Sequence, residues 1–319
     1  MTDNNPKLNG PKRQHFLPKF YLEGFTKEGK LALYDRERDE IRIQQSINTG
    51  VIGHFYTLQD SKGRNRYELE HLLSEYEGKS DKVIRKLVGK EGINADERTD
   101  LAIFIAFAAF RTPDLVDSLK AFNSGIIGNL ASNMFSDVEA VKAWMRKKQG
   151  LSVSEQEIEK EAEEHVAFAK SGSYKITTNH RWAVLTAMEM AFKVAPILAG
   201  RDWVLIHREN SKKSFITTDA PVVLTTIAPR KNNFYGIGFA NADALVMFPL
   251  TESTALLIYG NGGGLEHMQA NTEQVRHINL ALADRCQRFV IGREKELVRS
   301  LVDYLGLASK VWQPKMQTS

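Results

Sequence analysis

A short aromatic segment near the start of the chain contains a histidine suited to proton transfer. His15 precedes Pro18, and aromatic residues follow as far as Phe25. Because histidine titrates near neutral pH, His15 can serve as a general base, a general acid or a metal ligand. The aromatic residues can equally fill a hydrophobic core, with His15 hydrogen-bonded at its edge. Both interpretations of this segment stay open.

A carboxylate follows a predicted strand in the second half of the chain. The β-prone run at 215–217 leads directly into Asp219, and Pro221 comes two residues later. Loops held by a rigid sheet commonly contain functional residues, and a carboxylate there suits a divalent cation or a general base. Alternatively, Asp219 bonds to the backbone of its own turn before Pro221, as aspartate often does.

Arg111 ends an apolar helical run and is followed by Pro113. Its guanidinium can neutralise the carboxyl end of that helix. It can also project into a pocket and bind a phosphate or carboxylate through paired N–H groups.

Two further carboxylates belong to a helix predicted to begin near Tyr67. Glu70 and Glu77 are seven residues apart and therefore share one face of that helix. Paired carboxylates can hold a metal ion, although such rows also form ordinary solvated faces.

The elements that would position these residues alternate between strand and helix patterns. Runs at 31–34 and 41–43 flank a charged stretch and predict a hairpin, and 51–58 is predicted to be a third strand. From Tyr67 the apolar period becomes helical, and Pro113 is predicted to open a helix at its first position. Strands return after Gly200, at 203–207, 215–217, 222–226, 245–248, 255–259 and 288–291, with helices at about 271–284 and 294–306.

This order predicts an α+β fold. We expect the N-terminal and C-terminal strands to form a largely antiparallel sheet, covered by a central helical block at about 66–198. The sequence predicts a single domain over residues 14–306, a polar, disordered tail at 1–13 and a C-terminal tail at 307–319. Residues distant in the sequence would then lie close together.

Composition is that of a globular protein, with 42% hydrophobic and 26% charged residues among 319. The apolar run at 101–110 is about half the roughly 20 residues that span a bilayer, so we expect a buried helix and no membrane association. The first residues lack the apolar segment of a secretory signal, and we expect a cytoplasmic protein. One cysteine, Cys286, allows no internal disulfide. The net charge of +4 decides nothing about nucleic acid.

Several short motifs resemble the family called domain of unknown function 4238 (DUF4238). They occur in family order over roughly residues 14–292, and include His15, Pro18, Tyr21-Leu22, Phe25, His54-Phe55-Tyr56-Thr57, Glu70, Glu77, Phe110-Arg111-Thr112-Pro113, Trp203, the 215–222 segment around Asp219, Phe248-Pro249-Leu250 and Ile278-Asn279. One departure is Ala220, where relatives more often have asparagine, so a ligand made by that amide would be missing here.

The resemblance implies that His15, Arg111 and Asp219 are important, but it brings no established activity. It implies a candidate role in bacterial defence against phage, with nucleic acid as the suggested target. Our leading hypothesis is a hydrolase acting on nucleic acid, a metal-dependent nuclease. In this hypothesis the catalytic residues are His15, Asp219 and Glu70, and Asp219 and Glu70 also bind Mg²⁺ or Mn²⁺. The substrate is bound by Arg111, Tyr21 and Asn279.

The rival hypothesis is a non-catalytic sensor or interaction protein. Its aromatic N-terminal segment and Arg111 would bind single-stranded nucleic acid, a phosphorylated ligand or a phage protein. In a third reading, all these motifs serve only to fix the N-terminal segment against the core.

Overall fold

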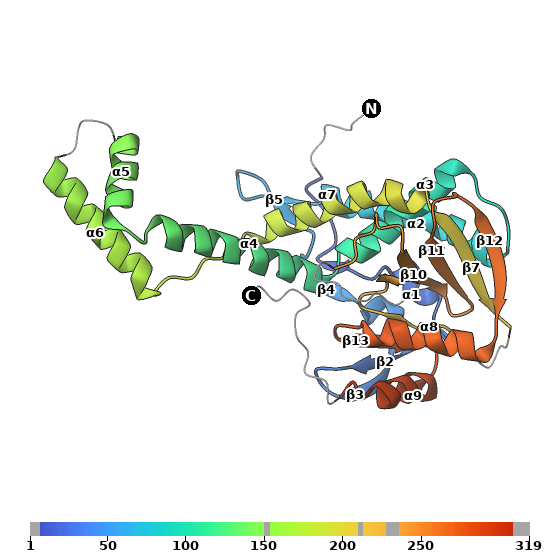
Figure 1. Cartoon of the computed structure of the whole chain (residues 1–319). Helices are drawn as coiled ribbons and strands as arrows, with labels where there is room; N and C mark the ends of the chain where they lie inside the picture. Colours follow the sequence, from blue (N-terminus) through green and yellow to red (C-terminus); the bar gives the residue numbers. More distant parts are fainter. Residues whose placement is uncertain (1–6, 150–153, 210–212, 228–235, 309–319) are drawn as a thin grey trace. The chain divides into compact units, whose positions relative to one another are not determined.

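The computed structural model describes residues 7–149, 154–209, 213–227 and 236–308 (Figure 1). Much of the tail predicted at 1–13 and nearly all of that at 307–319 lie outside the described residues. The chain divides into two compact units: Met1–Leu115 with Val184–Gln313, and Val116–Ala183 with Pro314–Ser319. The helical block expected at about 66–198 is divided between these units.

In the first unit, a four-stranded sheet joins the two ends of the chain. Strands β2 (Lys30–Asp35) and β3 (Glu40–Gln45) form the predicted antiparallel hairpin. Next to β2 lies β13 (Phe289–Gly292), followed by the short β8 (Thr217–Thr218), both antiparallel to their neighbours. Helix α9 (Lys295–Leu305) packs on this sheet. The predicted pairing of N-terminal with C-terminal strands is confirmed.

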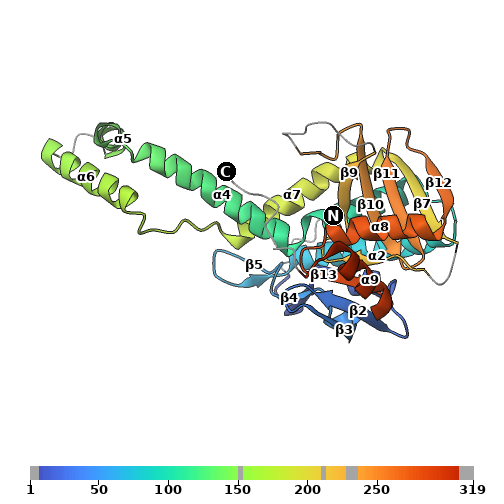
Figure 2. The same cartoon turned by 60° about the horizontal axis from the view of Figure 1, so that its bottom comes forward.

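A second sheet of the first unit has five strands, in the order β12 (Leu265–Ala270), β7 (Asp202–Arg208), β11 (Thr254–Tyr259), β10 (Ala244–Thr251) and β9 (Val223–Thr226). Only the β12–β7 pair is parallel among these neighbours. Helix α8 (Thr272–Asp284) runs between the two sheets in both views (Figures 1 and 2).

The α+β class and the antiparallel character are confirmed, but the strands form two main sheets where a single sheet was expected. The apolar residues of α8 explain the division. Leu282 belongs to a hydrophobic cluster that contains Tyr34 and Val290 of the first sheet and also Met247 of the second. Val275 belongs to a cluster with Val204 of the second sheet. Helix α8 therefore packs against both sheets and lies between them.

The strand predicted at 51–58 is wrong in its extent. Strand β4 (Val51–Gly53) pairs with β1 (Arg13–His15), and the chain then turns before β5 (Leu58–Gln59), which pairs with β6 (Asn65–Arg66). His54 has a φ of 54°, a left-handed conformation that interrupts any strand. A short 3₁₀ helix, η1 (Ser46–Asn48), precedes β4. Strand β12 was not predicted, because Glu266, His267 and Gln269 make this edge strand polar.

Three long helices complete the strand-bearing unit: α2 (Glu68–Val88), α3 (Ala95–Phe110) and most of α7 (His180–Ala199). The apolar run of α3 is buried as expected, and Phe104 packs edge-on against Phe248 of β10, with ring centroids 6.2 Å apart. Asn94 caps α3 by accepting a hydrogen bond from the Glu97 N–H at 2.8 Å. By length and composition α7 could cross a membrane, a test that core helices of soluble proteins also pass.

The second unit is helical. It contains most of α4 (Pro113–Met134), together with α5 (Val138–Gln149) and α6 (Glu155–Ser171). Pro113 is the first residue of α4, as predicted. Helices α5 and α6 share a small apolar core of Val141, Met145, Ile158, Ala162 and Val166.

Candidate functional site

Hydrogen bonds from one buried glutamine hold His15 in place. The Gln14 amide oxygen accepts from the Tyr56 N–H at 2.6 Å, and its amide nitrogen donates to the Thr57 hydroxyl at 3.0 Å. The Tyr56 hydroxyl in turn donates to the Arg111 carbonyl at 3.0 Å. Three motifs far apart in the sequence are thereby joined, and β1 ends with His15 beside the helices.

Helix α1 (Lys19–Glu23) follows at once and is anchored by Tyr21. The Tyr21 ring is buried and stacks on Phe248 with centroids 5.3 Å apart. Its hydroxyl donates to the Pro249 carbonyl at 2.9 Å and lies 2.8 Å from the Thr217 hydroxyl. Tyr21, predicted to bind substrate, is thus placed in the core, where it fixes α1 against β8 and β10.

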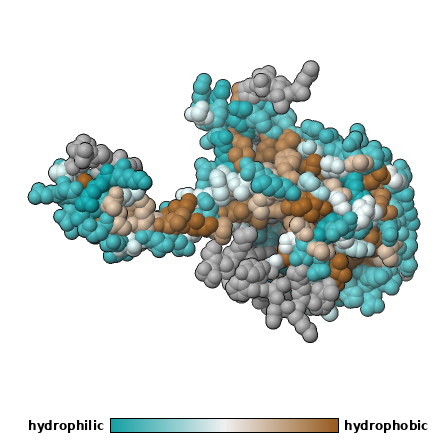
Figure 3. All heavy atoms as spheres, turned by 45° about the horizontal axis from the view of Figure 1, so that its top comes forward, coloured by the Kyte–Doolittle hydropathy of each residue, from teal (hydrophilic) through white to brown (hydrophobic). Residues whose placement is uncertain are grey.

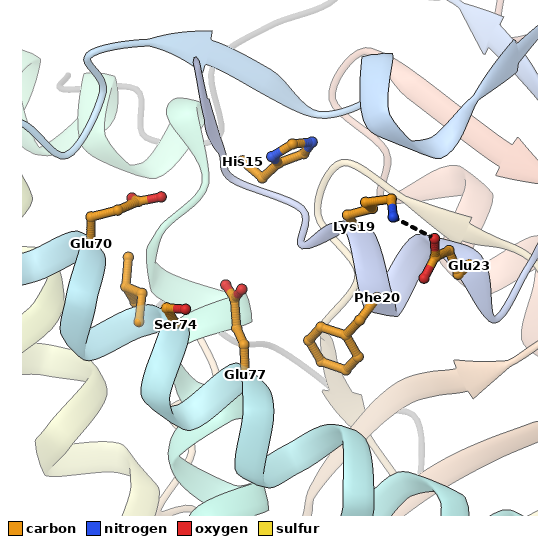
Figure 4. A pocket seen from close by; sticks show the side chains of 8 residues that line it. His15, Lys19, Phe20, Glu23, Glu70, Ser74 and Glu77 are labelled. Carbon is orange, nitrogen blue, oxygen red and sulfur yellow. Dashed lines mark ion pairs between the residues drawn. The ribbon is translucent and has the colours of Figure 1, made fainter. Parts of the chain in front are cut away.

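A pocket of about 320 Å³ lies between α1 and α2 (Figure 4). Its volume is at the lower end of the range for small-molecule sites. The His15 imidazole lies on the opposite side of the pocket from the α2 carboxylates Glu70 and Glu77. The lining residues are His15, Lys19, Phe20, Glu23, Glu70, Leu73, Ser74 and Glu77.

Burial favours the neutral form of the His15 imidazole. Burial lowers its pKa below the ordinary value, although a backbone hydrogen bond to Ile47 opposes the shift. Among the described residues the buried Nε2 has no hydrogen-bond partner. A neutral imidazole keeps a lone pair on one ring nitrogen, as a general base requires.

The pKa of Glu70 is shifted in the opposite direction to that of His15. Burial raises its pKa to about 7, the negative charge of Glu77 adds to the rise, and Arg111 opposes it. A carboxyl group with this pKa is partly protonated at neutral pH and can donate a proton, as a general acid must. One pocket thus contains an imidazole whose neutral form is favoured and a carboxyl group that is partly protonated at neutral pH.

Glu77 is held by a buried cation. The Arg111 side chain is fully buried, and its Nη1 donates to Glu77 at 2.8 Å. The Nε and Nη2 atoms of Arg111 have no hydrogen-bond partner within the described part of the chain. Arg111 is not among the residues that line the pocket, so it acts on the pocket from behind Glu77.

Replacing Glu70 with glutamine is expected to stabilise the protein at alkaline pH. The folded-state pKa lies above the ordinary value, so the buried carboxylate costs stability; this cost is absent below pH 4.5 and complete above pH 7. We expect Glu70→Gln to raise the free energy of unfolding by about 1–3 kcal/mol at pH 8, with no change at pH 4.5. Urea unfolding at both pH values measures this.

The matched control is Glu75→Gln on the same helix. Glu75 is exposed and pairs with Lys79 at 3.0 Å, and such surface pairs contribute about 0–1 kcal/mol. Equal stability of Glu70→Gln and the wild type at pH 8 would show that Glu70 is solvated like Glu75.

Asp219 lies elsewhere, in the turn after β8. Its carboxylate is buried and accepts hydrogen bonds from the backbone N–H groups of Gln287 at 3.0 Å and Arg288 at 2.6 Å. Burial raises its pKa to about 6, although these N–H groups oppose the rise. Asp219 does not line the pocket of His15 and Glu70. It joins the β8 turn to the start of β13.

Asp219→Ala is expected to destabilise the fold by about 2–4 kcal/mol, because two buried N–H groups lose their acceptor. Asp219→Asn keeps one acceptor oxygen and should lose roughly half as much. Chemical unfolding of the three proteins at pH 7.5 tests this order. An alanine variant as stable as the wild type would mean that Asp219 has no structural role.

Asn279 also bonds to the backbone of the 214–216 segment. Its amide nitrogen donates to the Ser214 carbonyl at 2.8 Å, and its amide oxygen accepts from the Ile216 N–H at 3.0 Å. It lines a different pocket, of about 240 Å³, beside α8 and α9. Its predicted contact with a substrate stays a prediction.

The donor types at the first pocket suit a hard divalent cation in part. Across residues 7–149, 154–209, 213–227 and 236–308, no group of three His, Cys, Asp or Glu side chains is arranged to hold a metal ion. Mg²⁺, however, is often held by one or two carboxylates, with waters and substrate phosphates completing its shell. Glu70 and Glu77 share the pocket, whereas Asp219 does not.

Sequence reasoning missed part of this site. Gln14 was not singled out, although a glutamine that is fully buried must satisfy several hydrogen-bonding atoms. Lys19 and Glu23 form an exposed pair at 3.0 Å on the rim, four residues apart (Figure 4). Glu77 was noted as a partner of Glu70 and among the residues of the family resemblance, but it was not predicted as a site residue. Its spacing of seven residues was the available signal.

The fold and the pocket define an α+β protein with an acidic, histidine-containing pocket beside its N-terminal segment. A family model described as protein of unknown function (DUF4238) matches residues 13–296, and the chain belongs to this family. Searches of curated proteins and of solved structures gave no significant match.

Proposed function

We propose that the protein is a hydrolase acting on nucleic acid and that RNA is its substrate. The observation on which this rests is that one pocket brings together the His15 imidazole, whose buried Nε2 has no hydrogen-bond partner among the described residues, and the partly protonated Glu70 carboxyl group. A base and an acid on opposite sides of a bound group are what phosphodiester cleavage by an internal hydroxyl requires.

RNA provides that hydroxyl itself. In the proposed step a ring nitrogen of His15 takes the proton of a 2′-hydroxyl, and the 2′-oxygen forms a bond to the adjacent phosphorus. The bond from phosphorus to the 5′-oxygen breaks, and Glu70 gives its proton to that oxygen. The products are a 2′,3′-cyclic phosphate and a 5′-hydroxyl. Solvent then returns the two residues to their starting protonation states.

Two cations support the handling of a phosphate in this pocket. Lys19 is exposed on the rim, and its pairing with Glu23 is a surface contact that a phosphate can displace. Arg111 is a positioning residue that fixes Glu77 and adds positive charge behind the pocket. The carboxylates repel phosphate elsewhere in the pocket, so binding would be strongest near Lys19.

A metal-dependent form of the proposal uses the same pocket. In it Glu70 and Glu77 would hold Mg²⁺ or Mn²⁺, which would offset their charge and supply an activated water for hydrolysis of DNA as well as RNA.

Cleavage assays with matched substrates separate these forms. The full chain is incubated with single-stranded RNA, with DNA of the same sequence, and with RNA whose 2′-hydroxyls are methylated, each in EDTA, Mg²⁺ or Mn²⁺. We expect only unmodified RNA to be cleaved in EDTA, leaving cyclic phosphate ends. Cleavage of DNA that depends on a metal ion would support the second form. No cleavage of any substrate would contradict both forms.

Phe20 favours a second candidate, a protein that binds single-stranded nucleic acid without cutting it. Its half-buried ring lines this pocket and also a neighbouring one of about 340 Å³. Base stacking on an aromatic ring is worth about 1–3 kcal/mol. Phe20→Leu should then weaken RNA binding roughly tenfold or more in fluorescence anisotropy, with wild-type RNA left intact.

Phage defence is the proposed biological setting. Cells expressing the wild type should reduce phage plating, and cells expressing His15→Ala at equal levels should not. Equal protection by both proteins would show that phage defence does not depend on this pocket.

A further inference from the structure

Helix α4 has one covered face and one exposed apolar face within the second unit. The covered face packs against the segment before α7: Thr178 donates to the Lys120 carbonyl at 3.1 Å, and its hydroxyl lies 2.9 Å from that of Ser124. The exposed face is a ridge of Phe122, Ile126, Leu130 and Met134 at four-residue spacing, with Ile127 beside it. Figure 3 shows apolar residues gathered along α4.

The exposed fractions are large for such side chains. Leu130 is 63% exposed, Phe122 46%, and Ile126 and Ile127 each 42%. Together with Met134 they present roughly 400 Å² of apolar surface, within the roughly 300–600 Å² of the largest patches on monomers, which are often functional. We call these five side chains the α4 ridge.

The α4 ridge also lies in a stretch without charge. Residues 121–136 contain no Asp, Glu, Lys or Arg, and the nearest charges before it, Asp117 and Lys120, pair with each other at 2.6 Å. A surface helix normally has charged residues facing water. An uncharged, apolar ridge matches only another uncharged, apolar surface.

We propose that the α4 ridge is the contact between two copies of this chain in a two-fold dimer. A two-fold interface uses the same patch on both subunits, and a ridge without charges can face itself without repulsion. Side chains at four-residue spacing form the rows that interdigitate when two helices cross.

The area agrees with a dimer of moderate affinity. Two ridges contribute roughly 800 Å², and the Ala, Gly, Ser and Asn residues around them bring the total to about 1,000–1,200 Å², near the lower limit of specific interfaces. We therefore expect dimerisation in the micromolar range. The proposal is independent of the pocket and its chemistry.

The test measures the mass of the full chain in solution by sedimentation velocity between about 1 and 100 μM. The variant is Leu130→Glu, at the centre of the ridge. The matched control is Met268→Glu, on edge strand β12 of the other unit, where Met268 is 50% exposed. Circular dichroism confirms that each variant keeps the wild-type helix content.

We expect a wild-type dimer, an unchanged Met268→Glu dimer, and a dissociation constant raised at least tenfold by Leu130→Glu. A folded wild type that stays monomeric at 100 μM would overturn the proposal, as would a Leu130→Glu protein that dimerises like the wild type. Flotation with phosphatidylcholine vesicles tests whether the ridge binds a membrane surface instead of a second copy of the chain. A wild type that is monomeric in solution and floats with the vesicles would assign the ridge to a membrane surface instead.

Discussion

Replacing His15 with alanine is expected to lower the rate of RNA cleavage by about 10²–10⁴-fold, the usual contribution of a positioned proton-transfer group. The variant lacks the imidazole that would take the 2′-hydroxyl proton. The loss should appear in kcat, because RNA contacts at Lys19 and Phe20 are unchanged. Initial rates with a labelled oligonucleotide measure it.

The pH dependence provides a second readout of the same step. His15 must be neutral, and its pKa lies below the ordinary value, so activity should rise with pH on the acid side of neutrality. Glu70 must be protonated, and its pKa is about 7, so activity should fall above pH 7. The profile of kcat/KM should therefore be a bell between these limits. Glu70→Gln should be strongly impaired and lose the alkaline limb.

His71→Ala is the matched control. His71 is exposed on α2, one residue from Glu70, and does not line the pocket. Its loss should leave both rate and profile unchanged. If His15→Ala cleaves RNA as fast as His71→Ala, His15 is not the base and the proposed reaction at this pocket is wrong.

The largest effect on stability is expected at the buried ion pair of Glu77 and Arg111. Glu77→Leu should lower the free energy of unfolding by about 3–5 kcal/mol, because it leaves a fully buried guanidinium without its carboxylate. The double variant Glu77→Leu/Arg111→Met should recover most of this loss, since it removes the stranded charge and keeps similar volume. Urea unfolding of the two variants and the wild type measures both changes.

A surface pair on the same helix serves as the control. Asp81 and Arg85 are 2.9 Å apart, with Arg85 76% and Asp81 32% exposed, so water screens the pair and Asp81→Leu should cost at most about 1 kcal/mol. If Glu77→Leu lowers the free energy of unfolding no more than Asp81→Leu does, the strong coupling inferred for the buried pair is wrong. A double variant as unstable as Glu77→Leu alone would show that shape, rather than charge, dominates there.

The local elements could largely be predicted because their signals lie within a few neighbouring residues. Asn94 with Glu97 specifies the start of α3, and Pro113 specifies the start of α4. The strand predicted at 51–58 failed for a tertiary reason. Gln14, far away in the sequence, bonds to Tyr56 and Thr57 and stabilises a turn there.

The candidate site was predictable only in its separate parts. Spacing placed Glu70 and Glu77 on one helix face, and chemistry singled out His15. From the sequence, Asp219 and Glu70 were both plausible site residues. The Asp219 carboxylate, however, accepts hydrogen bonds from the backbone at 287 and 288. No sequence pattern separates a carboxylate that caps backbone N–H groups from one that lines a pocket, because the difference lies in the distant partner.

By itself the sequence determined the α+β class, the family, most element boundaries and the two helix-borne carboxylates, since periodicity, capping and turn chemistry act over short range. Only the tertiary structure decided that His15, Glu70 and Glu77 share a pocket, and that Arg111, Tyr21 and Asn279 are held by buried contacts. It also raised the pKa of Glu70, and it left the buried His15 Nε2 without a hydrogen-bond partner among the described residues. Burial and long-range hydrogen bonding produce these properties, and neither exists until residues far apart in the chain are packed together.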